Sequence, residues 1–319
     1  KGTYWLIALA GGNGTRSFTK TGNATIKGTS DAPVSVNGGL FGCGSNGRGE
    51  SATGSIEYCT LSANELEIAS VNRGMLENVD FTFKNCTFSN NIYAYLGSTY
   101  KWADGYSTST VGVPQKVKFT IESTCTGVPS FGISEGLDKA SVELTGAKGK
   151  IAPYNNGNNN NIVKSFTIGS DKTWTFNDGL EMTNDVTLTK TGTLKVAGTY
   201  TVSTAAQLED AIQQEAVTEI LLNNGDYELT KLLEINRPIT LSSANTDSKA
   251  KIKGHISITA EGVTVKDIDL EYTKGENVLY SDKNGISVFA NEATITGNSF
   301  KTTDNTVTNG IVFYPKGKS

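Results

Sequence analysis

Two of the four cysteines, Cys59 and Cys86, occupy the same point of a repeated phrase. The phrase reads I-E-Y-C-T-L-S-A-N over 56–64 and F-K-N-C-T-F-S-N-N over 83–91, a register of 27 residues. If the copies stack, the two thiols lie side by side and point inward. Stacked cysteines could form a ladder of free buried thiols or a disulfide, because the Cα spacing of neighbouring strands falls within the range that a disulfide allows. Parallel side chains hold their Cβ atoms slightly too far apart for a bridge, which favours free thiols.

The remaining residues able to do acid, base or metal chemistry are scattered. Cys43 and Cys125 lie outside the phrase, and no C-x-x-C pair is present, so we expect neither a metal site nor a cofactor. His255, the single histidine, lies between K-I-K-G and I-S-I, and no serine or cysteine motif marks a nucleophile beside it. We therefore expect His255 to sit at a strand end and predict no catalytic residue. The chain has four arginines, Arg16, Arg48, Arg73 and Arg237.

Asp267 and Asp269 resemble a carboxylate pair. In the repeat alignment Asp267 matches Asn85 at a turn, whereas Asp269 matches Ser299 on an outward strand face. This favours structural roles over calcium binding or acid–base catalysis. Arg237 precedes Pro238 at a strand entry, so a turn role is expected for it as well.

An aromatic, glycine-containing segment is the best binding candidate. It reads I-Y-A-Y-L-G-S-T-Y-K-W-A-D-G-Y over 92–106. Exposed aromatic rings stack on the apolar faces of sugars, and a nearby carboxylate accepts hydroxyl hydrogen bonds. Alternatively, Tyr93 and Tyr95 face inward and Trp102 covers the core. The candidate glycan-binding residues are Tyr100, Trp102, Asp104 and Tyr106.

The elements that must position these residues are short strands. The phrase recurs as V-K-D-I-D-L over 265–270 and I-T-G-N-S-F over 295–300, a register of 30 residues, and I-S-I at 256–258 matches I-S-V at 286–288. Apolar residues alternate within each copy, which is strand periodicity. Strand units of this length bury their inner faces by stacking, so the sequence predicts an all-β, right-handed parallel β-helix.

A change of pattern at Thr204 predicts a helix over 204–215. Thr204 and Gln207 have capping-box spacing, and Leu208, Ala211 and Ile212 form one apolar stripe. We interpret this helix as the cap of a second β-helical unit, which gives units over 1–200 and 201–319. The alternative is one continuous β-helix that contains the helix.

Part of the chain resembles the start of pectin-lyase-like β-helix proteins. The resemblance covers about a quarter of the chain and rests on the helix over 204–215, I-L-L-N-N-G-D-Y (220–227), R-P-I-T-L (237–241), K-I-K-G (251–254) and G-V-T-V-K-D-I-D-L (262–270). N-G-G-L-F-G over 37–42 is similar to glycine-leucine repeats of bacterial adhesin-like surface proteins. Together these imply a secreted bacterial surface protein of the gut Bacteroides type, and the lyases of the superfamily imply polysaccharide cleavage as the alternative.

Composition excludes several classes of function. The formal net charge is −4 and no basic stripe is present, which excludes a nucleic-acid footprint. No apolar run approaches the roughly 18 residues of a membrane span. The short run Y-W-L-I-A-L-A over 4–10 is predicted to be a buried strand, with a signal-peptide core as the alternative, and the start at Lys1 suggests that an upstream segment has been removed.

We thus expect a secreted or cell-surface protein that binds glycans without cleaving them. A polysaccharide lyase or glycoside hydrolase is the second hypothesis, and a phage tail-spike fragment is the third. A lyase needs a positive centre for the uronate carboxylate and a poised base, and the sequence shows no cluster of either.

Overall fold

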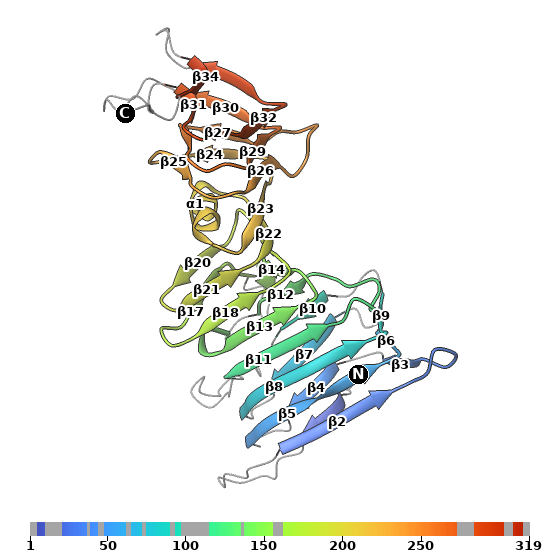
Figure 1. Ribbon diagram of the computed structural model, residues 1–319. Helices are drawn as coiled ribbons and strands as arrows, with labels where there is room; N and C mark the ends of the chain where they lie inside the picture. The colour runs from blue at the N-terminus through green and yellow to red at the C-terminus, as the bar shows by residue number, and fades with distance from the viewer. Residues whose placement is uncertain are drawn as a thin grey trace. The chain divides into compact units, whose positions relative to one another are not determined.

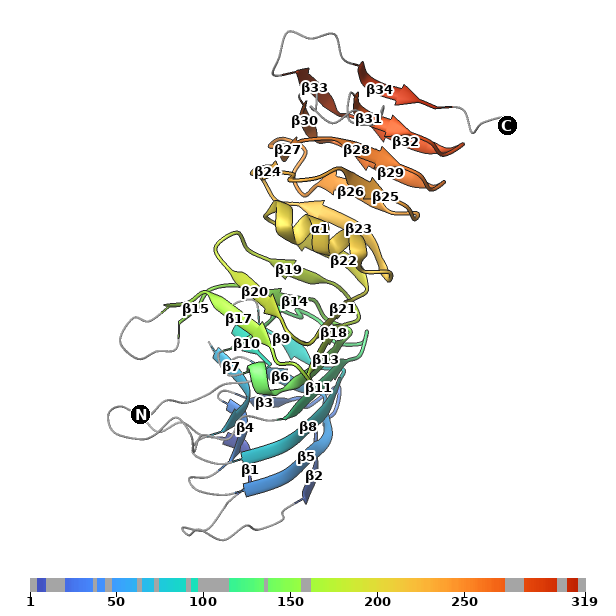
Figure 2. The same cartoon turned by 90° about the vertical axis from the view of Figure 1, so that its left-hand side faces the viewer.

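The computed structural model describes residues 5–9, 21–36, 39–43, 48–61, 65–71, 75–89, 93–96, 115–134, 137–155, 162–272, 284–302 and 309–314. The described part is all-β apart from one α-helix and a short 3-10 helix, and its sheets are almost entirely parallel (Figures 1 and 2). The prediction of an all-β chain of parallel strands is confirmed. The chain divides into two compact units, Lys1–Val196 and Ala197–Ser319.

Unit 1 contains the longest strands. One parallel sheet runs in the order β2 (Thr21–Lys27), β5 (Arg48–Glu57), β8 (Met75–Lys84), β11 (Lys116–Ile121), β13 (Ser141–Thr145), β18 (Thr173–Phe176) and β21 (Thr193–Val196). A second contains β1 (Trp5–Leu9), β4 (Gly39–Cys43), β7 (Glu65–Val71), β10 (Tyr93–Tyr95), β12 (Phe131–Gly132), β14 (Gly149–Ile151) and β19 (Leu180–Met182). A third, short sheet consists of β3 (Val34–Val36), β6 (Cys59–Leu61) and β9 (Thr87–Phe88).

Smaller elements complete unit 1. β17 (Ser165–Ile168) and β20 (Thr187–Lys190) pair in parallel, β15 (Tyr154–Asn155) and β16 (Ile162–Val163) pair antiparallel, and a 3-10 helix spans Leu137–Lys139. Trp174 on β18 is fully buried, and its Nε1–H donates to the Ala140 carbonyl at 3.1 Å.

Alternating side chains build the core of unit 1. On β11, Val117, Phe119 and Ile121 are buried, while the residues between them face outward. Phe83 lies with its ring centroid 5.7 Å from that of Phe88 and 6.1 Å from that of Phe119. Burying each such ring is worth about 1.5–3 kcal/mol, so these tilted ring contacts help to hold β8, β9 and β11 together.

Unit 2 repeats this organisation with shorter strands. One sheet contains β22 (Gly198–Val202), β23 (Val217–Leu222), β26 (Thr240–Ser243), β29 (Val263–Lys266) and β32 (Ala293–Thr296). A second sheet consists of β24 (Asp226–Glu228), β27 (Lys251–Lys253), β30 (Asp269–Tyr272) and β33 (Ser299–Thr302). A third sheet consists of β25 (Leu233–Ile235), β28 (Ile256–Ile258), β31 (Asn284–Val288) and β34 (Asn309–Phe313).

The predicted registers are confirmed in both units. In unit 2 Val265 pairs with Ile295, and Leu270 pairs with Phe300, as the spacing of the two later copies of the phrase predicts. In unit 1 Ile56 pairs with Phe83, as the spacing of the two earlier copies predicts. The repeated phrase therefore marks residues that stack on neighbouring strands.

The turn inside the repeated phrase has one backbone conformation. Tyr58, Asn85 and Asp267 have φ of 51°, 49° and 57°, and Gly297 has φ of 67° at the same point of the fourth copy. This left-handed conformation is easy for Gly and tolerated by Asn and Asp, which explains why those residues recur there. It redirects the chain from β5 to β6, from β8 to β9, from β29 to β30 and from β32 to β33.

The helix α1 (Ala205–Gln213) begins and ends slightly inside the predicted 204–215. Thr204 is its N-cap and accepts from the Gln207 amide at 3.3 Å, and the Gln207 side chain accepts from the Ser203 amide at 2.8 Å. Leu208 and Ile212 are among its buried residues, and α1 packs on β22, β23 and β24. The predicted apolar stripe is therefore the face that α1 turns to the first strands of unit 2.

Candidate functional site

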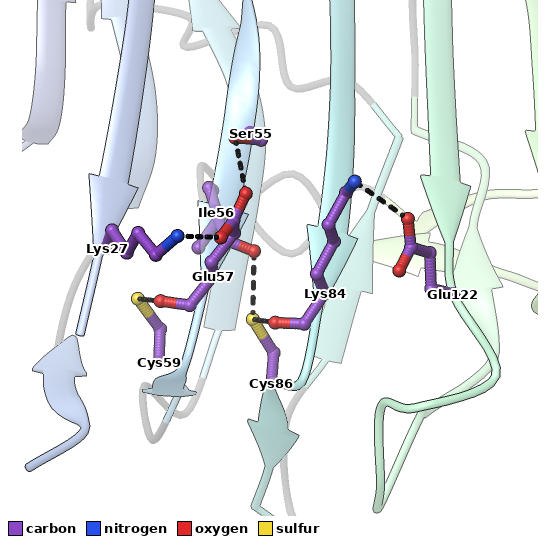
Figure 3. Close-up of polar contacts among 8 residues, drawn as sticks. All are labelled: Lys27, Ser55, Ile56, Glu57, Cys59, Lys84, Cys86 and Glu122. Atoms are coloured by element: carbon purple, nitrogen blue, oxygen red, sulfur yellow. Dashed lines mark hydrogen bonds and ion pairs between the residues drawn. The ribbon is translucent and has the colours of Figure 1, made fainter. Parts of the chain in front are cut away.

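Cys59 and Cys86 form the start of a stack of thiols in unit 1. β6 and β9 pair in parallel, with Thr60 opposite Thr87, so the cysteines that precede these threonines lie at equivalent points of consecutive turns of the chain. Both are only 1% exposed. The Cys59 thiol donates to the Glu57 carbonyl at 3.4 Å, and the Cys86 thiol lies 3.2 Å from the carbonyl oxygens of both Ile56 and Lys84 (Figure 3). The predicted burial and adjacency are confirmed, and both thiols are free in the structure.

Cys125 is a third member of this stack, although it lies outside the repeated phrase in the sequence. Thr126 forms a parallel β-bridge with Thr87, and the Thr126 amide donates to the Cys86 carbonyl at 2.9 Å. Cys125 therefore lies next to Cys86 in the stack, on the side away from Cys59. The sequence concealed this because the turn after Ile121 is longer than the turn after Phe83. We call Cys59, Cys86 and Cys125 the cysteine stack.

The three thiols are not equivalent. Contact with the Cys86 thiol, opposed by burial, lowers the pKa of Cys125 to about 7. The same contact, together with burial, raises the pKa of Cys86, and burial raises the pKa of Cys59. Cys125 is also the least buried of the three. At neutral pH Cys125 is therefore the member of the stack that carries thiolate, the reactive form of cysteine.

Charged side chains of alternating sign flank the stack. Lys27 lies 3.1 Å from Glu57, and Lys84 lies 3.1 Å from Glu122, while Glu57 and Lys84 are register partners on β5 and β8 (Figure 3). The hydrogen bond from Lys27 is the main cause of the lowered pKa of Glu57. Alternation of this kind balances the charges of these four residues.

A row of hydroxyl groups lies on the outward face of the sheet from β2 to β18. Each register step along the row joins neighbouring strands, and Asn177 Nδ2 donates to Thr145 Oγ1 at 2.8 Å at its end. At about 4.8 Å per strand the row is about 24 Å long. We call it the hydroxyl row; its members are Thr25, Ser55, Thr82, Thr120, Thr145 and Asn177.

The lysines of unit 2 are also matched with acids on neighbouring strands. Lys253 Nζ lies 2.8 Å from Asp226 and 2.9 Å from Glu228, and these contacts raise its pKa, Asp226 being the larger cause. Lys301 lies 3.9 Å from Glu271 on the next pair of strands. Because acids and lysines alternate along this face, it offers no cluster of free cations for a uronate carboxylate within the described ranges.

The residues that suggested acid–base chemistry have structural contacts. His255 Nδ1 lies 2.7 Å from the Asn284 carbonyl, which can only accept, so Nδ1 carries the proton. Asp267 occupies the left-handed turn, and Asp269 on β30 accepts from the Ser299 hydroxyl on β33. The two carboxylates therefore serve different elements, and no group of metal ligands occurs among the residues that the structure describes.

Arg237 holds the end of α1, whereas the sequence predicted a role in the turn before Pro238. Its guanidinium donates to the carbonyl of Gln214, the C-cap residue, at 2.8 Å, to that of Ile212 at 3.4 Å, and to that of Val217. Carbonyls at a helix end have no partner within the helix, and a cation suits the negative end of the helix dipole. Arg237 is thus fully engaged in joining α1 to the sheet.

The predicted glycan-binding residues lie outside the described part of the chain. This applies to Tyr100, Trp102, Asp104 and Tyr106, so their role stays a prediction. No helix in the described ranges has the length and apolar character needed to cross a membrane.

Comparisons with known proteins return nothing similar to this chain. No protein-family model matches it, and neither the curated proteins nor the solved structures contain a significant match.

Proposed function

We propose that this protein is a right-handed parallel β-helix with a pectin-lyase-like second unit, secreted or held at the cell surface, that binds glycans without cleaving them. The hydroxyl row is the observation that carries the proposal. Its members are half-buried or exposed and lie in register across β2, β5, β8, β11 and β13, with Asn177 following β18.

The chemistry of the row suits an extended neutral polysaccharide. Each hydroxyl can donate one hydrogen bond and accept two, which matches the hydroxyls of a sugar in either direction. A polymer laid across the strands would meet one such group on each, so many weak contacts would add along its length. The aromatic residues Tyr100, Trp102 and Tyr106, together with the carboxylate of Asp104, belong to the same unit in sequence and remain a second candidate contact.

The surrounding charges argue for neutral over anionic glycans. Next to the row, Asp80, Lys118 and Glu143 are register partners on β8, β11 and β13, and Lys118 lies 3.6 Å from Glu143. Opposite charges on neighbouring strands neutralise one another, so these three residues do not form the positive centre that a lyase uses for a uronate.

A glycan array of neutral and anionic polysaccharides tests the proposal, followed by titration of the best ligand. Thr82→Val together with Thr120→Val removes two hydroxyls while keeping β-branched side chains. At about 1 kcal/mol for each lost hydrogen bond, affinity should fall about 30-fold. The matched control is Thr264→Val with Thr294→Val, an outward register pair in unit 2, which should leave binding unchanged.

Three outcomes would contradict the proposal. They are equal loss in the control, a ligand bound only through uronate groups, or new unsaturated ends when the chain is incubated with pectate, chondroitin sulfate, alginate or heparin. The last result would favour the lyase hypothesis. A trimer by light scattering, with no glycan bound, would favour the tail-spike hypothesis. Trp102→Ala in the same titration tests the aromatic segment separately.

A further inference from the structure

The cysteine stack brings two unlike thiols together: Cys86 lies just before β9, and Cys125 lies just before the residue that bridges to β9. Thr126, the residue after Cys125, bridges to Thr87, the residue after Cys86, so the two cysteines occupy equivalent points on consecutive turns of the chain. Their backbones are fixed by two bonds, from the Thr126 amide to the Cys86 carbonyl and from the Phe88 amide to the Thr126 carbonyl, both 2.9 Å. Neighbouring turns of the chain are about 4.8 Å apart, which lies inside the Cα range that a disulfide tolerates. Cys125 lies outside any strand, so its side chain is not bound to the parallel strand geometry that disfavours a bridge between stacked strand residues.

Access differs sharply along the stack. Cys59 and Cys86 are 1% exposed, whereas Cys125 is half-buried. On the far side of Cys59, its partner on β3 is Val34, so the stack ends there. A small oxidant arriving from solvent therefore meets Cys125 first, and Cys86 is the next thiol inward.

Protonation differs in the same direction. The pKa of Cys125 falls to about 7 chiefly through its contact with Cys86, against the opposing effects of burial and the nearby Glu122 carboxylate. Contact with Cys125 and burial raise the pKa of Cys86, which stays protonated. At neutral pH the Cys125 thiol is thus the nucleophile, and the Cys86 thiol keeps its proton.

We propose that Cys125 is a redox-active cysteine and that Cys86 is its resolving partner. The Cys125 thiolate attacks a peroxide oxygen, the O–O bond breaks, and a sulfenic acid and hydroxide form. The Cys86 sulfur then attacks the Cys125 sulfur, an S–S bond forms, and the sulfenic oxygen leaves as water with the Cys86 proton. Overall the two thiols lose two electrons and two protons, and hydrogen peroxide is reduced to two water molecules.

The product would join consecutive turns of the chain in unit 1. The loop that it closes runs from residue 86 to residue 125 and includes the aromatic segment over 92–106. Oxidation would therefore tether the chain on both sides of that segment. The inference does not rest on glycan binding, because it uses only the geometry and chemistry of the stack.

Peptide mapping of the oxidised native protein tests the proposal. The four cysteines fall on four tryptic peptides, 28–48, 49–73, 85–101 and 119–139. The reduced, folded protein is treated with hydrogen peroxide at pH 7, alkylated, unfolded and digested. We expect peptides 85–101 and 119–139 to appear joined, with a mass lower by two hydrogen atoms than the sum of the free peptides.

Single variants identify the order of events. Cys125→Ser, at the half-exposed position, should abolish the link, while Cys59→Ser should leave it unchanged. In Cys86→Ser, dimedone should trap sulfenic acid on peptide 119–139. A first link between 49–73 and 85–101, a link that survives Cys125→Ser, or no link in the wild-type protein would each overturn the proposal. The wild-type map decides the question even if a variant folds poorly.

Discussion

Arg237 offers a sharp test of how unit 2 is held together. Arg237→Met keeps a long apolar side chain but removes the guanidinium that donates to the carbonyls of Gln214, Ile212 and Val217. Those carbonyls belong to the end of α1 and to β23, so the substitution cuts the polar connection between helix and sheet. We expect the end of α1 to fray and the chain to lose stability.

The magnitude follows from the hydrogen bonds. Bonds to a charged group contribute about 1.5–3 kcal/mol each, and the bond to Ile212, at 3.4 Å, is too long to count fully. Arg237 is half-buried, so water replaces part of the lost contact, and the expected loss in free energy of unfolding is about 2 kcal/mol. Arg237→Lys should recover about half of this loss, since an ammonium lacks the planar fork.

Urea unfolding followed by far-UV circular dichroism measures the loss. With a slope of about 2 kcal/mol/M, the midpoint should fall by about 1 M. Hydrogen exchange of residues 204–217 should accelerate at the same time. The matched control is Lys231→Met, which removes an exposed ion pair to Glu209 at 3.2 Å on the same helix and should change stability by less than about 0.5 kcal/mol.

An Arg237→Met loss no larger than that of this control would contradict the prediction. The prediction also fails if exchange at the end of α1 is unchanged, because the loss would then arise somewhere other than the helix terminus.

Three further predictions concern the turns, the thiols and the charges. Asn85→Val should lower the free energy of unfolding by about 1–2 kcal/mol, because φ at this position is 49°, while Asn85→Gly should stay close to wild type; similar losses in both would show that backbone conformation is not the cause. The rate of Cys125 alkylation should rise with pH through a midpoint of about 7, because only the thiolate reacts, and a midpoint near the ordinary value of about 8.5 would contradict this. Lys253→Glu should destabilise the protein most at low ionic strength, because it places a third carboxylate beside Asp226 and Glu228; salt should narrow the difference from wild type, and a salt-independent loss would exclude electrostatic repulsion.

Strand pairing could be predicted from the sequence where paired strands recur at a fixed interval. Where two successive turns of chain have the same length, as between Val265 and Ile295, the alternating apolar residues repeat at a fixed interval and reveal the strand pairing. The capping residues Thr204 and Gln207 likewise predicted the start of α1, because capping depends on residues only a few positions apart in the chain.

Where the number of residues between paired strands varies, the sequence did not predict which strands pair. Phe83 pairs with Ile121 across a long stretch of chain, whereas Val117 pairs with Val142 across a much shorter one, so no single period connects these strands. The hydroxyl row and the alternation of lysines with acids both depend on this pairing. They could not be read from composition, because each consists of residues that are ordinary on any exposed strand.

The sequence by itself determined the class of the fold, the inward position of Cys59 and Cys86, and the turn at Asn85, because these follow from local periodicity and local backbone preference. Only the tertiary structure showed that Cys125 lies beside Cys86 and that the Arg237 guanidinium binds the carbonyls at the end of α1. Both contacts join residues far apart in the chain, across turns of unequal length. Their partners are set by how whole strands stack, since burial of the shared apolar core fixes the register and the side chains at its edge follow.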